Sequence, residues 1–231
     1  MKLALGGVAA LAIVLLALGW WLGYFTDPPE EASLEATVDA VAADSTGTDE
    51  LVDGSLEGQW MVESAQEATF VGYRINEVLT TIGDFEVVGR TSDVVGTLTI
   101  DGQTVVAAEF TVDVATLTTD QDRRDKEMRE QSMETDLFPE ATFVLTDSIE
   151  LEGVPGEGEV IDLNVVGDLT MHGVTQLVEI PMDAQVVGGL IVVVGQLDIL
   201  LSDYGIDAPE AAIVASIEDA GVLEFSLVFA R

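Results

Sequence analysis

The chain has 231 residues, of which 43 are acidic and 8 are basic, so its formal net charge at pH 7 is -35. Because this charge repels phosphate backbones and anionic lipid head groups, it argues against a nucleic acid as a partner. The sequence contains no cysteine, which excludes a disulfide framework, a thiol nucleophile and a thiolate metal site.

The first predicted element is an apolar helix over residues 3–25, which contain no charged side chain. At 1.5 Å per residue this stretch spans roughly 34 Å, enough to cross the core of a bilayer. Trp20, Trp21 and Tyr24 would then lie at the far interface. A cleaved signal peptide is the alternative, with Ala17 and Gly19 as its small-x-small pair, but no polar region precedes that pair.

We therefore favour a retained anchor, in a protein that passes the cell membrane once. Lys2 and the terminal amino group are the only positive charges that flank the apolar helix. Positive charge tends to stay on the cytoplasmic side, so the rest of the chain is expected on the extracytoplasmic side.

Residues 26–58 are predicted to form an acidic, disordered linker. They contain ten acidic residues, no basic residue and no aromatic residue, and they begin near Pro28-Pro29. Such a composition cannot bury enough apolar surface to fold and repels itself. Its expected role is to hold the following domain away from the membrane surface.

The remaining residues, 59–231, are predicted to form one antiparallel β-domain, because apolar and polar residues alternate along several stretches. The expected inward-facing residues are Val94, Gly96, Leu98 and Ile100; Val106, Ala108, Phe110, Val112 and Val114; Phe143, Leu145, Ile149 and Leu151; and Leu223, Phe225, Leu227 and Phe229. Glu224 and Ser226 would face water. Asp101-Gly102, His172-Gly173 and Gly188-Gly189 are typical of tight turns. About eight such strands can close into a barrel that is either filled or open to one ligand.

Two short helices are expected besides these strands. From Asp120 to Met133, opposite charges recur at i, i+4, which stabilises a solvated helix. The pairs are Asp122 with Lys126, Arg123 with Glu127, Asp125 with Arg129, and Lys126 with Glu130. A second helix is predicted over Pro209 to Ile217, with proline in its first turn.

Five groups of residues, taken in order, resemble those of the YceI-like family. They are Gly83-Asp84-Phe85, Arg124-Asp125, Leu137 to Phe143, Gly167 to Thr175, and Asp203-Tyr204-Gly205-Ile206. Each group alone is weak, but their common order over one domain length argues against coincidence. The resemblance covers roughly residues 59–231. It implies a lipocalin-like antiparallel barrel that binds polyisoprenoid lipids.

Arg124 is the candidate for a polar lipid head group, because it belongs to a matching group and its guanidinium forms a planar fork of donors. The basic cluster around it holds four of the eight basic residues, Arg123, Arg124, Lys126 and Arg129, but acidic neighbours surround them. Internal ion pairing therefore explains the cluster as a whole.

No catalytic residue, metal site or cofactor is predicted. His172 is the only histidine and lies in an expected turn, and one imidazole among carboxylates is a poor metal site. No pair of carboxylates stands out as acid and base, and no nucleophile elbow, phosphate loop or calcium loop occurs.

Aromatic residues are spread over most of the predicted strands, and core packing explains each one alone. The family resemblance implies that these aromatic residues together line an apolar tunnel. The candidate ligand-binding residues are Phe70, Tyr73, Phe85, Phe110, Phe138, Phe143 and Phe225, with Arg124 for the head group. The sequence departs from the family in having Leu200-Leu201 before Ser202-Asp203-Tyr204-Gly205, where a basic residue is usual. Either a charged head would thus be held less firmly, or a neutral quinone would be preferred.

The function predicted from the sequence is non-catalytic binding of a long-chain isoprenoid or a similar, quinone-like amphiphile. The main alternative is a structural or adhesive surface domain whose barrel is packed shut. A hydrolase or isomerase that uses carboxylates is the third possibility.

Overall fold

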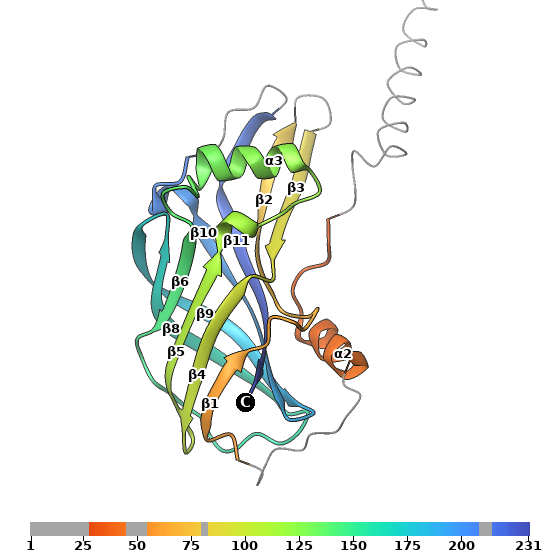
Figure 1. The fold of residues 1–231 in the computed structure, drawn as a ribbon, viewed down its shortest axis with the longest axis vertical. Coiled ribbons are helices and arrows are strands. Elements are labelled where there is room, and N and C mark those ends of the chain that lie inside the picture. The colour runs from red at the N-terminus through yellow and green to blue at the C-terminus, as the bar shows by residue number, and fades with distance from the viewer. Residues whose placement is uncertain (1–27, 45–54, 80–82, 208–213) are drawn as a thin grey trace, which may run out of the picture.

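A computed structural model describes residues 28–44, 55–79, 83–207 and 214–231 (Figure 1). Eight of its strands close into an antiparallel barrel, as the sequence predicts. In order around the barrel they are β1 (Gly58–Val62), β4 (Val94–Asp101), β5 (Thr104–Asp113), β6 (Glu140–Leu145), β8 (Val160–Met171), β9 (Val174–Val187), β10 (Leu190–Leu200) and β11 (Val214–Ala230). The ring closes where Met61 and Val62 of β1 pair with Ala230 and Phe229 of β11.

The other elements extend or cap this barrel. A hairpin of β2 (Phe70–Leu79) and β3 (Gly83–Thr91) continues the sheet from the first part of β11, and the short β7 (Ile149–Glu150) pairs with β5. The 3-10 turns η2 (Val114–Thr116) and η4 (Leu201–Tyr204) and helix α2 (Leu34–Asp44) connect or flank the strands. Helix α3 (Asp122–Glu127) and its π-helical continuation η3 (Met128–Ser132) lie across one end, called the α3 end below (Figure 1).

The predicted turns are confirmed at two hairpins. Met171 pairs with Val174, so His172 and Gly173 form a two-residue loop, with φ of 50° and 75°. Gly188 and Gly189, with φ of 57° and 81°, do the same between β9 and β10. Positive φ at both central residues matches the twist of the flanking strands.

The predicted alternation is wrong at the start of β5, because the strand carries a bulge. Ala107 pairs with Thr99, but the next pair joins Val105 to Ile100, which leaves Val106 as an extra residue. An extra residue reverses the alternation. Val105 therefore points inward and is 6% exposed, whereas Val106 is 46% exposed.

The first predicted helix is present and the second is wrong where it is described. Asp125 does not contact water on the surface of α3 but is buried, and it accepts hydrogen bonds from the backbone N and Oγ1 of Thr119 at 2.9 and 2.7 Å. Residues 208–213 lie outside the described ranges, and Val214 to Ile217 belong to β11. Pairing with β2 there, as between Ile217 and Glu77, favours a strand.

The prediction of a disordered linker is wrong for residues 28–44, called the strap below, which lie against the outside of the barrel (Figure 1). Val41 of α2 is fully buried against Val192 and Val228. No helix within the described residues is long and apolar enough to cross a membrane. The predicted anchor over residues 3–25 lies outside the described ranges.

The strap also explains why Glu224 and Ser226 are fully buried rather than facing water. Ser226 donates a hydrogen bond to the carbonyl of Ala68 at 2.7 Å and shares another with the hydroxyl of Thr37 at 2.9 Å. The outer face of β11 is therefore polar but dry, and each buried polar group has a partner, as burial requires.

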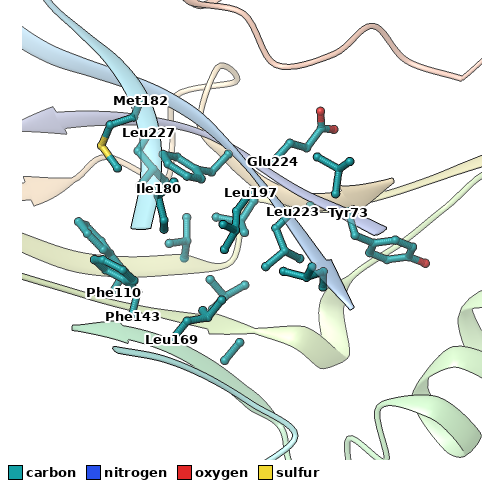
Figure 2. A pocket seen from close by; sticks show the side chains of 18 of the residues that line it. Tyr73, Phe110, Phe143, Leu169, Ile180, Met182, Leu197, Leu223, Glu224 and Leu227 are labelled. Atoms are coloured by element: carbon teal, nitrogen blue, oxygen red, sulfur yellow. The ribbon is translucent and has the colours of Figure 1, made fainter. Parts of the chain in front are cut away.

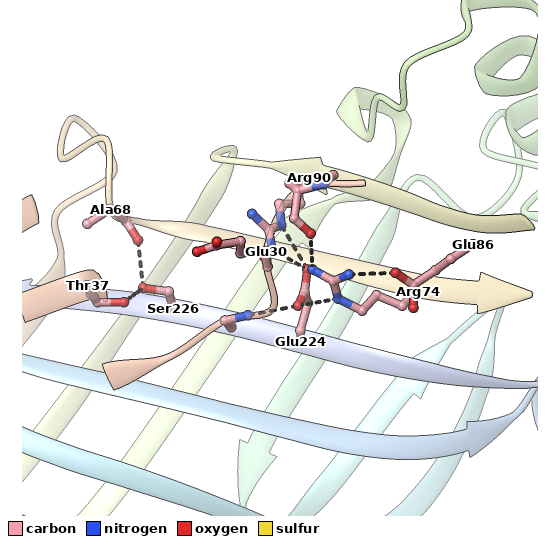
Figure 3. Close-up of polar contacts among 10 residues, drawn as sticks. Glu30, Thr37, Ala68, Arg74, Glu86, Arg90, Glu224 and Ser226 are labelled. Carbon is pink, nitrogen blue, oxygen red and sulfur yellow. Dashed lines mark hydrogen bonds and ion pairs between the residues drawn. The ribbon is translucent and has the colours of Figure 1, made fainter. Parts of the chain in front are cut away.

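Glu224 holds the strap through two arginines, Arg74 and Arg90, and these three residues are called the Glu224 cluster (Figure 3). Glu224 accepts from Arg74 Nε at 2.9 Å, from Arg90 Nε at 2.8 Å and from the backbone N of Ala32 at 3.1 Å. The same arginines donate to the strap, Arg74 to the carbonyl of Pro29 at 2.7 Å and Arg90 to that of Glu30. The carboxylate thereby fixes both arginines and the strap.

Four glycines, three in the barrel wall and Gly89 in the β2–β3 hairpin, each leave room for an aromatic ring from a neighbouring strand. A Cβ at Gly89, Gly96, Gly167 or Gly195 would lie only 2.3–2.4 Å from an atom of Tyr73, Phe110, Phe143 or Phe225, respectively. Each ring therefore lies flat along the wall, over a glycine of the neighbouring strand. This contact also helps to fix the register of the two strands. The aromatic residues therefore leave the middle of the barrel open.

Glu224→Gln tests the Glu224 cluster. The substitution leaves two charged arginines without their shared carboxylate, so we expect the free energy of unfolding to fall by about 3 kcal/mol. Urea unfolding of the full-length protein measures this change. Glu109→Gln, on the exposed outer face of β5, is the control and should cost less than about 0.5 kcal/mol. Equal losses for both variants would contradict a stabilising role of the cluster.

Gly96→Ala tests the arrangement of rings on the wall. The new Cβ would overlap Phe110, so we expect a loss of about 1–3 kcal/mol in the free energy of unfolding. In a Phe110→Ala background the same change should cost at least about 1 kcal/mol less, because the overlap with the ring is gone and only that with the Glu109 carbonyl oxygen, at 2.5 Å, is left. Gly153→Ala, where a Cβ meets nothing within 4 Å, is the control. Strictly additive losses at Gly96 and Phe110 would refute the contact.

Candidate functional site

The barrel encloses a cavity of about 480 Å³, which lies in the range of small-molecule sites. Its walls are the inward-facing side chains of the strands, nearly all aliphatic or aromatic. In Figure 2, Phe110 and Phe143 on one wall face Leu223 and Leu227 on the other, whereas Glu224 points away from them. The interior is therefore not packed shut by its own side chains.

Most of the predicted site residues line this cavity. They are Tyr73, Phe85, Phe110, Arg124, Phe143 and Phe225. Phe70 lies instead under the guanidinium of Arg90, whose Cζ is 4.1 Å from the ring centroid. It is three positions from Tyr73 on β2, an odd spacing that puts the two side chains on opposite faces. Phe138 precedes β6 and packs edge-on against His172, with ring centroids 4.5 Å apart.

The aliphatic majority of the lining is not marked by the residue pattern of the sequence. Strands β8, β9 and β10 contribute Leu163, Val165, Leu169, Ile180, Met182 and Leu197, among others. These strands are apolar on both faces in places. Helix α2 covers Val192 and Val194 from outside, whereas Leu177 and Leu200 are exposed to water. A simple alternation of apolar and polar residues is therefore weak there.

Polar groups gather where the cavity meets the α3 end. Arg124 Nε lies 3.6 Å from the Glu77 carboxylate, and Arg124 Nη1 donates to Asp120. The Arg124 guanidinium also lies 5.7 Å from the centroid of the Phe85 ring. The guanidinium predicted to bind a head group is thus already shared between two carboxylates of the protein.

Burial changes the proton affinity of two groups at this end. It raises the pKa of Glu77 above its ordinary value of 4.5, although nearby Arg124 acts in the opposite direction. Burial, with a smaller contribution from the charge of Asp125, also raises the pKa of Tyr73. The phenol therefore keeps its proton, and Glu77 holds its proton to higher pH than an exposed carboxyl does.

A third polar group, Ser132, lines the cavity with its hydroxyl buried. Its Oγ has no hydrogen-bond partner among the described residues. A buried hydroxyl without a partner is costly. With Tyr73 and Glu77, it gives the α3 end several groups that can hydrogen-bond a guest.

Residues from the five groups that carry the family resemblance contact one another in two sets: Phe85 with Arg124, and Phe138 and Tyr204 with His172. His172, at the tip of the hairpin between β8 and β9, contacts the carbonyl of Tyr204 at 3.3 Å and the carboxylate of Glu134 at 3.0 Å. It is the turn residue that the sequence predicts, and it also ties three loops together. Among the described residues, no three His, Asp or Glu side chains are placed to hold a metal ion.

Comparison with known sequences gives one family. The profile of the YceI-like domain matches residues 60–229. Protein YceI from Escherichia coli O17:K52:H18 is 28% identical over 137 residues, and that from Shigella flexneri is 27% identical over the same length. Both alignments cover 58% of this chain and 64% of the relative, so the chain matches less than two thirds of these relatives.

Solved structures share the barrel. A polyisoprenoid binding domain from Saccharophagus degradans, implicated in plant cell wall breakdown, superposes with a TM-score of 0.63 at 20% identity, over 76% of this chain and 99% of that domain. BcnA from Burkholderia cenocepacia gives 0.56 at 20% identity, over 74% and 99%. At these identities the likeness shows the fold, while the profile match spans most of the chain. The protein therefore belongs to the YceI-like domain family.

Proposed function

We propose that this protein binds a long-chain isoprenoid amphiphile with an uncharged head group and does no chemistry on it. The observation that carries the proposal is the apolar cavity inside the barrel, with hydrogen-bonding groups at one end. Each buried methylene contributes about 0.8 kcal/mol, so a prenyl tail is held by apolar contact alone. The structural similarity to a polyisoprenoid binding domain supports the same ligand class.

An uncharged head group fits the charges at the α3 end better than a pyrophosphate does. Arg124 is already bound to Asp120 and lies close to Glu77, so an anion would compete with both carboxylates. Tyr73 keeps its proton and can donate a hydrogen bond, as can Glu77 when it is protonated. A hydroxyl or a quinone carbonyl accepts such bonds without bringing a charge into the barrel.

The test compares two lipids with the same tail. Full-length protein should retain geranylgeraniol and bind geranylgeranyl pyrophosphate at least about tenfold more weakly, which is about 1.4 kcal/mol. Glu77→Gln removes one of the two carboxylates that share Arg124. It should therefore narrow the difference in affinity between the two lipids, whereas Glu109→Gln should not. Binding is measured by isothermal titration in detergent, and mass spectrometry of an organic extract identifies the native guest.

Two results would count against the proposal. If neither lipid binds and no lipid is extracted, the protein does not act as a lipid-binding barrel. If the pyrophosphate binds as tightly as the alcohol, the uncharged head group is wrong while the isoprenoid tail stands.

We also propose that residues 3–25 anchor the protein in the cell membrane, with the barrel on the extracytoplasmic side. The contact of Pro29 with Arg74 supports a short tether, because only residues 26–28 separate it from the predicted anchor. The four Cα–Cα steps from residue 25 to residue 29 span at most about 14 Å. The barrel would then lie at the bilayer surface with its β2–β3 side closest, and the linker would not hold it away.

Single cysteines can test this orientation because the chain has none of its own. A dye on Asn76→Cys, on the outside of β2, should transfer energy to acceptor-labelled lipid head groups more efficiently than a dye on Val144→Cys, on the outside of β6. The protein is full length and reconstituted in phosphatidylcholine vesicles. Equal efficiencies would contradict a fixed orientation, and a mature N-terminus at Trp20 or later would contradict the anchor.

A further inference from the structure

The wall of the barrel is split along part of the boundary between β9 and β10. The two strands pair from Val187 with Leu190 as far as Met182 with Gly195. Beyond that point, residues 174–181 pair with β8 and residues 196–200 pair with β11, but not with each other. Pro181, the next residue of β9, has no N–H to donate to a neighbouring strand.

Side chains close this split in place of backbone hydrogen bonds. Tyr204 of η4 is 2% exposed and belongs to a core cluster with Leu169, Met171 and Ile206. Partly buried residues from both sides of the split, Val178 and Ile199, pack against that cluster. Tyr204 thus fills the space where a ladder would otherwise run.

The loop that carries Tyr204 is held by the contact of its Tyr204 carbonyl with His172 at 3.3 Å and by hydrogen bonds between exposed groups. Gln176 donates to the carbonyl of Asp203 at 3.1 Å, which joins the loop to β9. Ser202 donates through its backbone N and Oγ to Asp219 at 2.9 and 2.7 Å. Exposed hydrogen bonds open at lower free-energy cost than buried ones, so the buried Tyr204 ring is the main barrier to opening this loop.

A groove of about 580 Å³ lies outside the split and adjoins the inner cavity. Ile199, Gly221 and Val222 line both spaces, so one layer of residues separates them. Two large apolar side chains border the groove in water, Leu177, which is 67% exposed, and Leu200, which is 46% exposed.

We propose that the split between β9 and β10 is the portal through which the prenyl tail passes between a bilayer and the cavity, with Tyr204 as its gate. This inference rests on the proposed lipid binding. The α3 end is a poor route for a tail, because Glu77, Arg124 and the helix lie across it. At the split, the tail meets Leu177 and Leu200 outside and Ile199 within. Tyr204 borders the outer groove and packs in one cluster with Leu169 and Ile199, which line the cavity, so the η4 loop must move together with the Tyr204 ring.

The test measures how fast a bound lipid leaves. Full-length protein is loaded with dansyl-labelled geranylgeraniol and mixed with an excess of phosphatidylcholine vesicles, and the change in dansyl fluorescence gives the release rate. Tyr204→Ala should speed release by about tenfold or more, a change in barrier of about 1.4 kcal/mol. Tyr204→Phe keeps the ring and should release at the wild-type rate.

Two surface variants keep the proposal testable if Tyr204→Ala does not fold. Gln176→Ala removes the exposed link to Asp203 and should also speed release. Leu177→Ser removes an apolar border of the portal and should slow both uptake and release by about threefold or more, within the range for losing a few apolar contacts. Val95→Ser is the matched control, since Val95 is 65% exposed on β4, away from the split.

The possible outcomes distinguish failure of the proposed portal from failure of the proposed lipid binding. Retention of the probe with unchanged rates in Gln176→Ala and Leu177→Ser would overturn the portal but leave the proposed function intact. Failure of the wild-type protein to retain the probe would overturn both. Faster release in Gln176→Ala together with slower transfer in Leu177→Ser, and no effect of Val95→Ser, would support the portal.

Discussion

The second half of strand β11, from Glu224 to Phe229, must be buried on both faces, and the rest of the structure depends on how this is achieved. Its inward residues, such as Phe225 and Leu227, line the cavity, and its outward residues Glu224 and Ser226 are fully buried. A carboxylate can be buried only when its charge is matched. Arg74 and Arg90 supply that match from the adjoining hairpin, so β2, β3 and the strap are all required to complete the wall of which β11 is part.

The inner face of the barrel could be predicted from the sequence, because side chains in a strand alternate strictly. Leu223 and Phe229 point inward as expected, and so do Phe143 and Leu145. Alternation fails at Val106, where a bulge inserts one residue and no local signal marks it. It also cannot show what lies outside a strand, because a polar residue on the outer face reads as exposed whether or not a distant segment covers it.

The same limitation explains why the sequence does not predict the strap. Residues 28–44 are acidic and rich in alanine, with no aromatic residue, and by composition they resemble a linker. Their order comes from tertiary contacts, chiefly Val41 against Val192 and the carbonyls of Pro29 and Glu30 against arginines far along the chain. Helical stability usually comes from such packing rather than from local propensity.

The candidate site was predictable to the extent that it depends on strands. Six aromatic or basic residues identified from the sequence line the cavity, whereas Phe70 lies on the wrong face of its strand and Phe138 in a loop. The polar groups at the α3 end were not predictable, because Glu77 and Ser132 resemble many other polar residues. Only the fold shows that Arg124 is already engaged by carboxylates, and this changes the expected head group.

The two halves of the barrel differ in what holds them closed. In the half far from the α3 end, β9 and β10 form a continuous ladder, and α2 covers Val192 and Val194 from outside. In the half near the α3 end, the ladder is absent between these described strands, the strap does not cover them, and Leu177 and Leu200 are exposed. Opening the first half would break backbone hydrogen bonds and uncover the apolar side chains under α2, whereas opening the second requires the displacement of one loop and one ring. The half of the wall with the β9–β10 ladder can keep its shape around a long apolar tail. The half without the ladder can open to admit that tail from the side, because the two halves are held closed by different contacts.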